Sequence, residues 1–358
     1  MTVRYFMKRQ LSIRKTAYNL IVLIISIVVS IMLGEIIIRI FIPQQESMRW
    51  FKSDAKYGYI LKKNFHQNYH YLGSDFVMEV QTNSWGHRYE EYDSLAFNEP
   101  NIKKILLIGD SFTFGYGINI EDQFGSILED LLNKSNDHFM IINAGVGGWG
   151  TLQATRYSHD NFSFFKPDII VYTFCGNDPD DDILFENKLA DNEKGVFYFP
   201  GKVFLRDHSH LYRFIFSRLK IYLHRVRLKR KSSDQPNRNI SLDTQSASII
   251  TEKEWNRTLN YLKDFHKDFI EFNPHGLLLI QASAPWSTDI RDHLNSISND
   301  SNLIYVDLYE ETISIPSIQR RLPHDGHWSE KIHRISAINL HKIISNRNLL
   351  LNQDKIEY

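Results

Sequence analysis

Residues 104–111 read KILLIGDS, a short apolar run that ends in glycine, aspartate and serine. An unbroken apolar run of this length is typical of a buried strand in a parallel sheet. Similar runs follow at 139–142, 168–174, 276–280 and 303–306. Helical patterns separate or follow them near 121–134, 151–165, 252–272 and 329–346. Strands that alternate with helices predict an α/β domain of three layers, with helices on both faces of a central parallel sheet.

The candidate site residues come at the ends of these strands, where the active site of such a sheet lies. Four short segments stand at these places: GDSF at 109–112, NAGVGGWG at 143–150, GND at 176–178 and HDGHW at 324–328. A serine at a strand-end turn, preceded by a glycine, can present its hydroxyl above the sheet. Each segment alone is ordinary turn chemistry, but their joint order at strand ends indicates a site.

This order of segments resembles the SGNH (GDSL-like) hydrolases, a family of esterases, lipases and carbohydrate O-acetyl-processing enzymes. The resemblance covers roughly residues 101–345. The phrase TNSWGHR at 82–88 is also similar to a segment that precedes the catalytic domain in some bacterial members. The resemblance implies a flavodoxin-like α/β/α domain.

The resemblance implies a role for each segment. Ser111 is the expected nucleophile, and His327 is the expected general base. A serine hydroxyl is a poor nucleophile at neutral pH, so an imidazole must take its proton. The backbone N–H of Ser111, Gly148 and the Asn177 side chain are the expected oxyanion hole, because the intermediate of acyl transfer carries a negative oxygen.

Asp325 is the nearest acceptor that can fix the tautomer of His327. Most family members place this aspartate three residues before the histidine, a position that His324 occupies here. Some relatives that acetylate exopolysaccharides, including alginate O-acetylation proteins, are similar in placing it two residues before. The spacing therefore favours polysaccharide O-acyl chemistry.

Two classes of function follow from these residues. The first is a serine esterase that acts on ester-linked acyl groups, O-acetyl above all, of a cell-envelope glycan or lipid through an acyl-serine intermediate; a polysaccharide O-acetyltransferase on the same fold differs only in the attacking hydroxyl. The second is a catalytically silent, anchored glycan-binding protein. The joint presence of Ser111, Gly148, Asn177 and His327 favours the enzyme.

Other side chains in the sequence are weaker candidates, for metal or thiol chemistry. His324, His327 and His333 with Asp325 are alternative metal ligands, but that interpretation leaves the serine segment unexplained, so we expect neither metal nor cofactor. We interpret the acidic run at 178–182 as a solvated loop rather than a Ca²⁺ site. Cys175, the single cysteine, is expected to be a small buried residue.

The N-terminus predicts a membrane anchor. Residues 20–42 form an apolar run of about 23 residues, roughly 34 Å as a helix, in which only Glu35 and Arg39 are charged. These two lie four apart and can pair near one end of the helix. The run is long for a cleaved signal peptide, and no A-x-A-like site follows it. Five cations precede it, at positions 4, 8, 9, 14 and 15. By the positive-inside rule the N-terminus is cytoplasmic and the rest lies outside, in the periplasm or on the surface of a bacterial cell.

The chain therefore divides into a cytoplasmic N-terminus (1–19), a transmembrane anchor (20–42), a stem (43–100) and a hydrolase-like domain (101–347) with an insertion at about 185–250. Residues 213–231 carry eight Lys or Arg and no acidic residue. This segment could lie on anionic lipid or bind an acidic polymer, but we expect an insertion helix packed on the domain with a solvated charged face. With 42 basic and 42 acidic residues the net charge is zero, which predicts no nucleic-acid partner.

Overall fold

The computed structural model describes residues 2–71, 76–134, 138–191, 201–219, 222, 250–298, 300–323 and 325–353. The chain forms two compact units. We call the first the anchor unit; it contains Met1–Ser47, His70–Phe76 and Phe197–Asp243. We call the second the sheet unit; it contains Met48–Tyr69, Val77–Val196 and Thr244–Tyr358.

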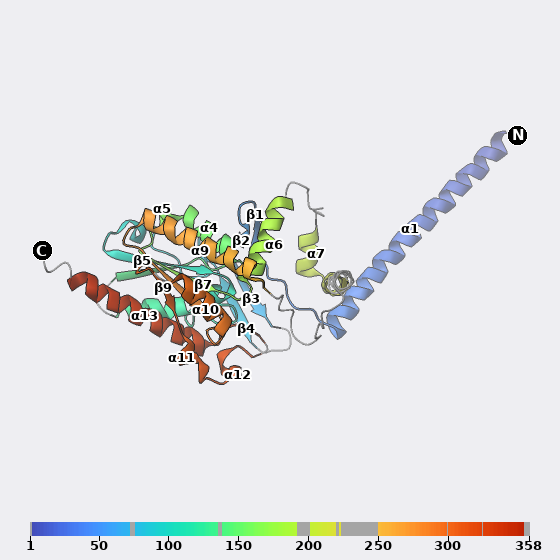
Figure 1. Cartoon of the computed structure of the whole chain (residues 1–358). Helices are drawn as coiled ribbons and strands as arrows, with labels where there is room; N and C mark the ends of the chain where they lie inside the picture. The colour runs from blue at the N-terminus through green and yellow to red at the C-terminus, as the bar shows by residue number, and fades with distance from the viewer. Residues whose placement is uncertain are drawn as a thin grey trace. The chain divides into compact units, whose positions relative to one another are not determined.

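The sheet unit is built on five parallel strands in the order β6-β5-β7-β8-β9 (Figure 1). The strands are β5 (Ile102–Gly109), β6 (His138–Asn143), β7 (Ile169–Phe174), β8 (Leu277–Ala282) and β9 (Leu303–Val306). All six residues of β7 and of β8 are buried, as their unbroken apolar sequences predict. The expected α/β fold with a central parallel sheet is confirmed.

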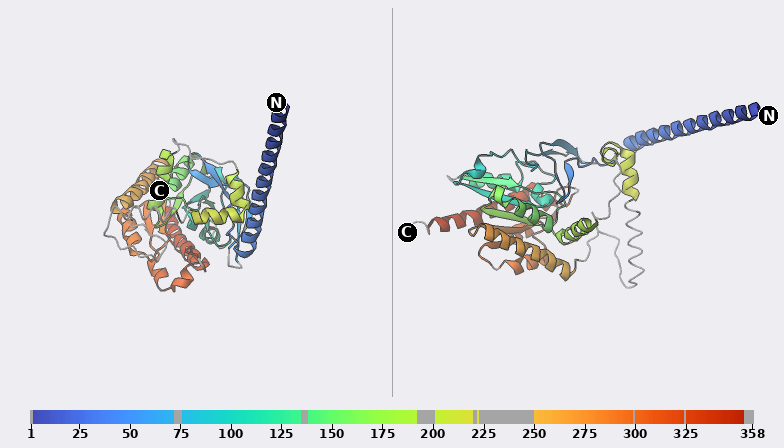
Figure 2. Two further views of the ribbon diagram at one scale, coloured as in Figure 1. Left: turned by 90° about the vertical axis from the view of Figure 1, so that its right-hand side faces the viewer. Right: turned by 90° about the horizontal axis from the view of Figure 1, so that it is seen from above.

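Helices cover both faces of this sheet (Figures 1 and 2). On one face α3 (Phe124–Leu132) packs against α13 (Glu330–Gln353), and on the other α4 (Thr151–Asp160) packs against α9 (Glu252–Phe272). A capping box starts α9, in which Thr251 and Glu254 each bond the other's backbone N–H. The other helices of the sheet unit are η1 (Ala96–Asn98), α2 (Ser111–Phe114), α5 (Phe162–Phe165), α6 (Asp178–Asp191), α10 (Thr288–Ile297), α11 (Tyr309–Ile313) and α12 (Ser317–Arg320).

Residues before the sheet add two antiparallel ribbons. β1 (Phe51–Asp54) pairs with β2 (Gly58–Leu61), and β3 (His66–His70) pairs with β4 (Val77–Gln81). The inward side chains of β3 and β4 are buried, Met78 and Val80 fully so. Residues 48–69 and 77–100 thus belong to the same compact unit as the parallel sheet. The domain boundaries expected from the sequence stay a prediction.

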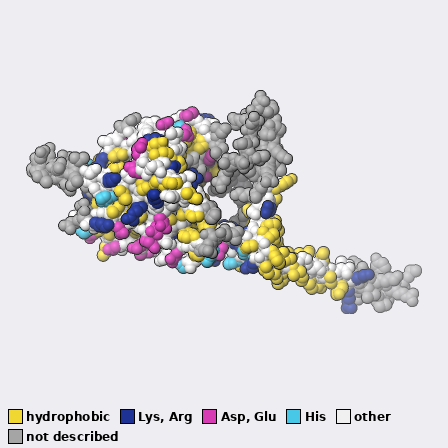
Figure 3. Space-filling view, turned by 90° about the horizontal axis from the view of Figure 1, so that it is seen from below, with side chains coloured by type: hydrophobic (Ala, Val, Ile, Leu, Met, Phe, Trp, Pro, Cys, Tyr) yellow, Lys and Arg dark blue, Asp and Glu magenta, His cyan; other side chains and the backbone are white. Residues whose placement is uncertain are grey.

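The anchor unit contains α1 (Thr2–Phe41) and α7 (Lys202–His208), followed by a helical segment at 210–219. Within α1 the part Arg14–Phe41 is long and apolar enough to cross a membrane, and its most apolar stretch is not buried. Figure 3 shows hydrophobic side chains along this helix.

Part of the basic segment 213–231 belongs to the anchor unit. Residues 220–221 and 223–231 of it lie outside the described residues. In the described part, the large apolar side chains of Ile215, Phe216, Leu219 and Tyr222 are exposed. The expected packing of this segment on the domain stays a prediction.

Candidate active site

Ser111 is placed by the sharp turn between β5 and α2. Gly109 has φ +142°, and a Cβ there would lie 2.8 Å from the carbonyl oxygen of Thr173 on β7. Only glycine fits such a backbone conformation against a neighbouring strand. Asp110 then caps α2, because its carboxylate accepts the N–H of Phe112 at 2.9 Å. Ser111 is therefore the first residue of α2, at the carboxyl end of the strand.

His327 contacts this serine although it lies near the other end of the domain's sequence. Its Nε2 lies 2.6 Å from the Ser111 hydroxyl oxygen, although 216 residues separate the two. The imidazole is flanked by the rings of Phe112 and Tyr116, whose centroids lie 4.9 and 4.7 Å from its own. These two aromatic rings come from the turn that carries Ser111, so the same segment places both the hydroxyl and the imidazole.

The loop that carries His327 is fixed at its base. Trp328 is fully buried, and its indole N–H donates to the carbonyl of Ser283 at 2.6 Å. The N–H of Leu322 donates to the carbonyl of His327 at 2.9 Å. One bond thus joins His327 to Leu322, and the other fixes the neighbouring Trp328 against the sheet unit.

Asp325 contacts the imidazole despite the short spacing. Its Oδ1 accepts the backbone N–H of His327 at 2.9 Å and also contacts Nδ1 of the same residue. The side chain folds back onto its own turn, as Asp does when it accepts an N–H two residues on. An aspartate two residues before the histidine therefore reaches the ring as part of a local turn. The structure thus brings together Ser111, His327 and Asp325.

The glycine-rich loop at 143–150 lies beside Ser111. Asn143 is buried and ties it down: its amide donates to the carbonyl of Thr113 at 2.9 Å, and its oxygen accepts the N–H of Gly145 at 3.0 Å. A Cβ on Gly147 would lie 3.7 Å from Cβ of Ser111. Gly148 has φ +78°, in the left-handed region that glycine adopts without strain.

Asn177 is exposed at the start of α6, where its amide donates to the carboxylate of Asp181. The structure therefore places the Gly148 loop against the serine, whereas the Asn177 amide has a carboxylate partner. The expected roles of Gly148 and Asn177 as oxyanion donors stay predictions.

Sequence reasoning missed Tyr59. This residue of β2 donates its hydroxyl to the carbonyl of Gly148 at 2.5 Å, with the carbonyl of Gly147 at 3.2 Å. Its own carbonyl accepts the indole N–H of Trp149 at 2.9 Å. Tyr59 thus holds the loop next to Ser111 from a region that the sequence suggested to be a stem. No motif in the sequence marks it.

Arg88 was part of the phrase TNSWGHR, but its role was not foreseen. Its side chain is fully buried, and no carboxylate hydrogen-bonds it among the described residues. The guanidinium instead donates to four backbone carbonyls, those of Glu79, Phe114, Gly115 and Ile118. Three of these carbonyls follow Ser111 directly in the chain, so Arg88 fixes the segment that leaves the serine turn.

The acidic run at 178–182 is not a solvated loop, and that interpretation was wrong. Asp178 begins α6 and is buried, where its carboxylate accepts from the Tyr172 hydroxyl and the Cys175 N–H. Carboxylates at a helix N-terminus are stabilised by the free N–H groups there. The signal for this helix start was present in the sequence, since a proline, Pro179, directly follows the aspartate.

Burial raises the pKa of two further groups of the sheet unit. Asp182 accepts the N–H of Leu152 and the hydroxyl of Thr258, both at 2.7 Å, and burial raises its pKa to about 7. Burial, together with the nearby Asp110 and Asp178, raises the pKa of the Cys175 thiol well above its usual value. Cys175 is thus a buried, neutral side chain, as expected.

The alternative metal ligands do not converge among the described residues. His333 is buried in α13, where its Nδ1 accepts the N–H of Phe124 at 3.2 Å, and burial lowers its pKa to about 3. His324 lies outside the described residues. In the part of the chain that the structure describes, no three His, Cys, Asp or Glu side chains are grouped to hold a metal ion.

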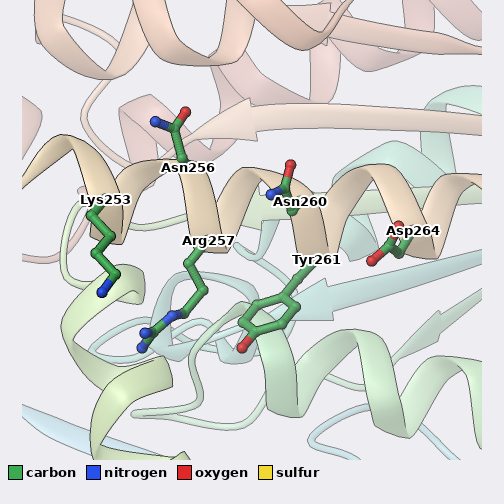
Figure 4. Close-up of a pocket in the computed structure, with 6 residues that line it drawn as sticks. All are labelled: Lys253, Asn256, Arg257, Asn260, Tyr261 and Asp264. Atoms are coloured by element: carbon green, nitrogen blue, oxygen red, sulfur yellow. The ribbon is translucent and has the colours of Figure 1, made fainter.

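A hollow of about 650 Å³ lies elsewhere in the sheet unit, along α9. Figure 4 shows its lining residues, Lys253, Asn256, Arg257, Asn260, Tyr261 and Asp264, all on that helix. Arg257 and Tyr261 both bond the carboxylate of Glu186. None of the residues grouped around Ser111 lines this hollow. We place the candidate site at the serine because of its contact with His327.

Several solved structures are similar to this chain. A family 3 carbohydrate esterase of Clostridium thermocellum is 15% identical, with a TM-score of 0.41, over 69% of this chain and 98% of that one. A lipase/acylhydrolase of Enterococcus faecalis is 17% identical, with a TM-score of 0.39, over 68% and 96%. The esterase EstA of Pseudoalteromonas sp. is 13% identical, with a TM-score of 0.39, over 68% and 97%.

No curated protein sequence matches this chain significantly. The sequence model of one family does match, over residues 107–335, which is more than half of the chain. That stretch runs from β5 into α13 and includes the serine turn, the glycine loop and the histidine loop. The chain belongs to the GDSL-like lipase/acylhydrolase family, the SGNH hydrolases, and is an enzyme of the ester-hydrolase class.

Proposed function

We propose that this enzyme is a serine esterase that removes ester-linked acyl groups, O-acetyl in particular, from a cell-envelope glycan or lipid through an acyl-serine intermediate. One observation carries the proposal: the Ser111 hydroxyl lies 2.6 Å from His327 Nε2, while Asp325 contacts the other ring nitrogen. With Nδ1–H directed at the carboxylate, Nε2 is free to accept the serine proton. This tautomer is the one that a general base requires.

In the first half-reaction Ser111 attacks the ester carbonyl carbon while its proton moves to His327 Nε2. The carbonyl oxygen becomes negative, and we assign its stabilisation to the N–H groups of Ser111 and Gly148 and to the amide of Asn177. Loss of one such donor typically removes about 2.7–4 kcal/mol of transition-state stabilisation. The C–O bond to the alcohol then breaks, and His327 gives its proton to the departing alcohol oxygen.

In the second half-reaction the histidine takes a proton from water, and the resulting nucleophile attacks the acyl-serine. The carboxylic acid leaves and Ser111 regains its proton. A sugar hydroxyl in place of water makes the same site a polysaccharide O-acetyltransferase. The spacing of Asp325, similar to that of exopolysaccharide-acetylating relatives, supports polysaccharide O-acyl chemistry for either candidate.

We also propose that α1 anchors the enzyme in a membrane, with the N-terminus in the cytoplasm and the sheet unit outside. The span Arg14–Phe41 and the cations before it support this topology. A reporter fused after Tyr358 should be active outside the cytoplasm. Activity of the fusion in the cytoplasm alone would contradict the topology.

The chemical proposal is tested by labelling the full chain with a fluorophosphonate probe. We expect one adduct, located on Ser111 by mass spectrometry, and burst kinetics with an activated acetate ester when deacylation is slow. Ser111→Ala should abolish both signals. The matched control is Ser301→Ala, at an exposed serine before β9, which should keep both.

An adduct on another residue would refute the nucleophile. No adduct in a folded chain, with probes of several sizes, would favour the silent binding protein. Acetyl release with and without acceptor glycans then separates esterase from transferase.

A further inference from the structure

Glu35 and Arg39 are the two charged residues near the outer end of α1, and the length of helix before them sets their depth in a membrane. Residues 16–34 form an uncharged stretch of 19 residues between Lys15 and Glu35. As a helix this stretch is about 28 Å long, close to the roughly 30 Å of a bilayer's hydrocarbon core. In a membrane-spanning α1, Glu35 therefore lies at the boundary between hydrocarbon and headgroups.

Glu35 holds a second helix at that depth. Its carboxylate accepts the hydroxyl of Ser209 at 2.8 Å, and the backbone N–H groups of His210 and Leu211 at 2.9 and 2.8 Å. It thereby caps the start of the helical segment 210–219, as an acidic group does at a helix N-terminus. Arg39 adds a bond from its guanidinium to the carbonyl of His208 at 2.9 Å and pairs with Glu35 itself.

Two further contacts fix the same junction. The N–H of Gln44 donates to Nδ1 of His210 at 2.9 Å. A Cβ on Gly34 would lie 3.2 Å from the side chain of Leu211, so the second helix packs closely on α1 there. The start of segment 210–219 is thus tied to the last two turns of α1, on both sides of Glu35.

One exposed face of this second helix is apolar. Ile215, Phe216, Leu219 and Tyr222 are 55, 46, 48 and 63% exposed. Their spacing of one, four and seven residues places them on one side of a helix. Arg218 borders this side, and Ser217 lies on the opposite one, by the same helical geometry. A helix with an apolar face bordered by Arg is the kind that lies in a membrane interface.

We propose that the helical segment 210–219, held by Glu35, lies in the plane of the membrane surface, and that Ile215, Phe216 and Leu219, together with Tyr222, insert into the outer leaflet. The inference rests on the proposed anchoring by α1. Its occupant is lipid because Glu35 fixes the helix at the level of the headgroups. The exposed apolar side chains lie one to three turns from that carboxylate, a distance at which acyl chains are within reach. The insertion thus gives the enzyme a second contact with the membrane.

The test uses nitroxide labels on the full chain, reconstituted in vesicles of phosphatidylcholine and phosphatidylglycerol. Labels are placed at Leu219→Cys, at the matched control Ser217→Cys and at Ile27→Cys in the middle of α1. The native Cys175 is buried, and the unsubstituted chain measures its background. Collisions of each label with oxygen, which concentrates in lipid, are compared with those of a water-soluble nickel complex.

We expect lipid-like exposure at 219 and 27 and water-like exposure at 217. Water-like exposure at 219 with lipid-like exposure at 27 would overturn this inference and leave the anchor standing. Water-like exposure at both would overturn the anchor and the inference with it. Glu35→Ala should move the 219 label toward water while the 27 label stays in lipid; an unchanged 219 label would overturn the role given to Glu35.

Discussion

Replacing Asp325 with asparagine exchanges one carboxylate oxygen for an NH₂ group and tests whether this side chain orients His327. The carboxylate contacts two N–H groups of His327, the backbone one at 2.9 Å and that of ring Nδ1. Both contacts are to the same oxygen, Oδ1. Asparagine keeps one oxygen and carries an NH₂ group in place of the other, and either of them can stand where Oδ1 now lies. If the NH₂ group faces Nδ1, the ring proton moves to Nε2, which then cannot accept from Ser111.

The size of the effect follows from this change of tautomer. In a fully buried triad the same substitution lowers kcat about 10⁴-fold, or about 5.4 kcal/mol of activation free energy. Here the side chains of His327 and Asp325 are 23 and 19% exposed, so water competes for part of the interaction. We therefore expect kcat to fall about 10²- to 10⁴-fold, which is about 3–5 kcal/mol, with little change in KM.

The assay is steady-state hydrolysis of an activated acetate ester by the full chain, with thermal unfolding as a check of the fold. The matched control is Asp268→Asn, an exposed carboxylate on α9 that lies 3.9 Å from the ring of His159. It should keep the parent kcat. If Asp325→Asn stayed within about threefold of the parent, then Ser111 and His327 would act as a dyad and the reasoning would be refuted.

Three further predictions concern the groups that support the site. Arg88→Met leaves buried carbonyls without donors, so the free energy of unfolding measured in urea should fall by about 3–5 kcal/mol. The control Lys63→Met, at an exposed lysine, should change this free energy little, and equal stability of the two variants would contradict the role of Arg88. Gly148→Ala puts a Cβ 2.8 Å from the Tyr59 hydroxyl at a positive φ and should slow labelling of the nucleophile. Tyr59→Phe removes the atom that this Cβ meets, so Gly148→Ala should slow labelling less in a Tyr59→Phe background than in the parent; an equal slowing in both would exclude this clash as the cause. The pKa of Asp182 is about 7 in the folded chain and roughly 3.9 in the unfolded chain. The folded state therefore binds this proton more tightly, and the free energy of unfolding falls by up to roughly 4 kcal/mol as pH rises from about 4 to 7. Stability curves of Asp182→Asn should thus fall less steeply than those of the parent over this range, and parallel curves would contradict the shift.

The sequence alone was enough for features that depend on local patterns. Unbroken apolar runs marked β5, β7 and β8 because strands buried on both faces need no polar side. The motif around Ser111 and the one around His327 identified the family through their order along the chain. The apolar span of α1 was equally visible, since length and hydrophobicity define it.

Only the tertiary structure decided how distant side chains meet. The 2.6 Å contact of Ser111 with His327 depends on strand pairing and on the loop closed by Trp328. Tyr59 and Arg88 act on backbone carbonyls of other segments, and such bonds leave no periodic or compositional trace in a sequence. A hydrogen-bond partner far along the chain is selected by the packing of whole elements, which is why these contacts needed the folded chain to be seen.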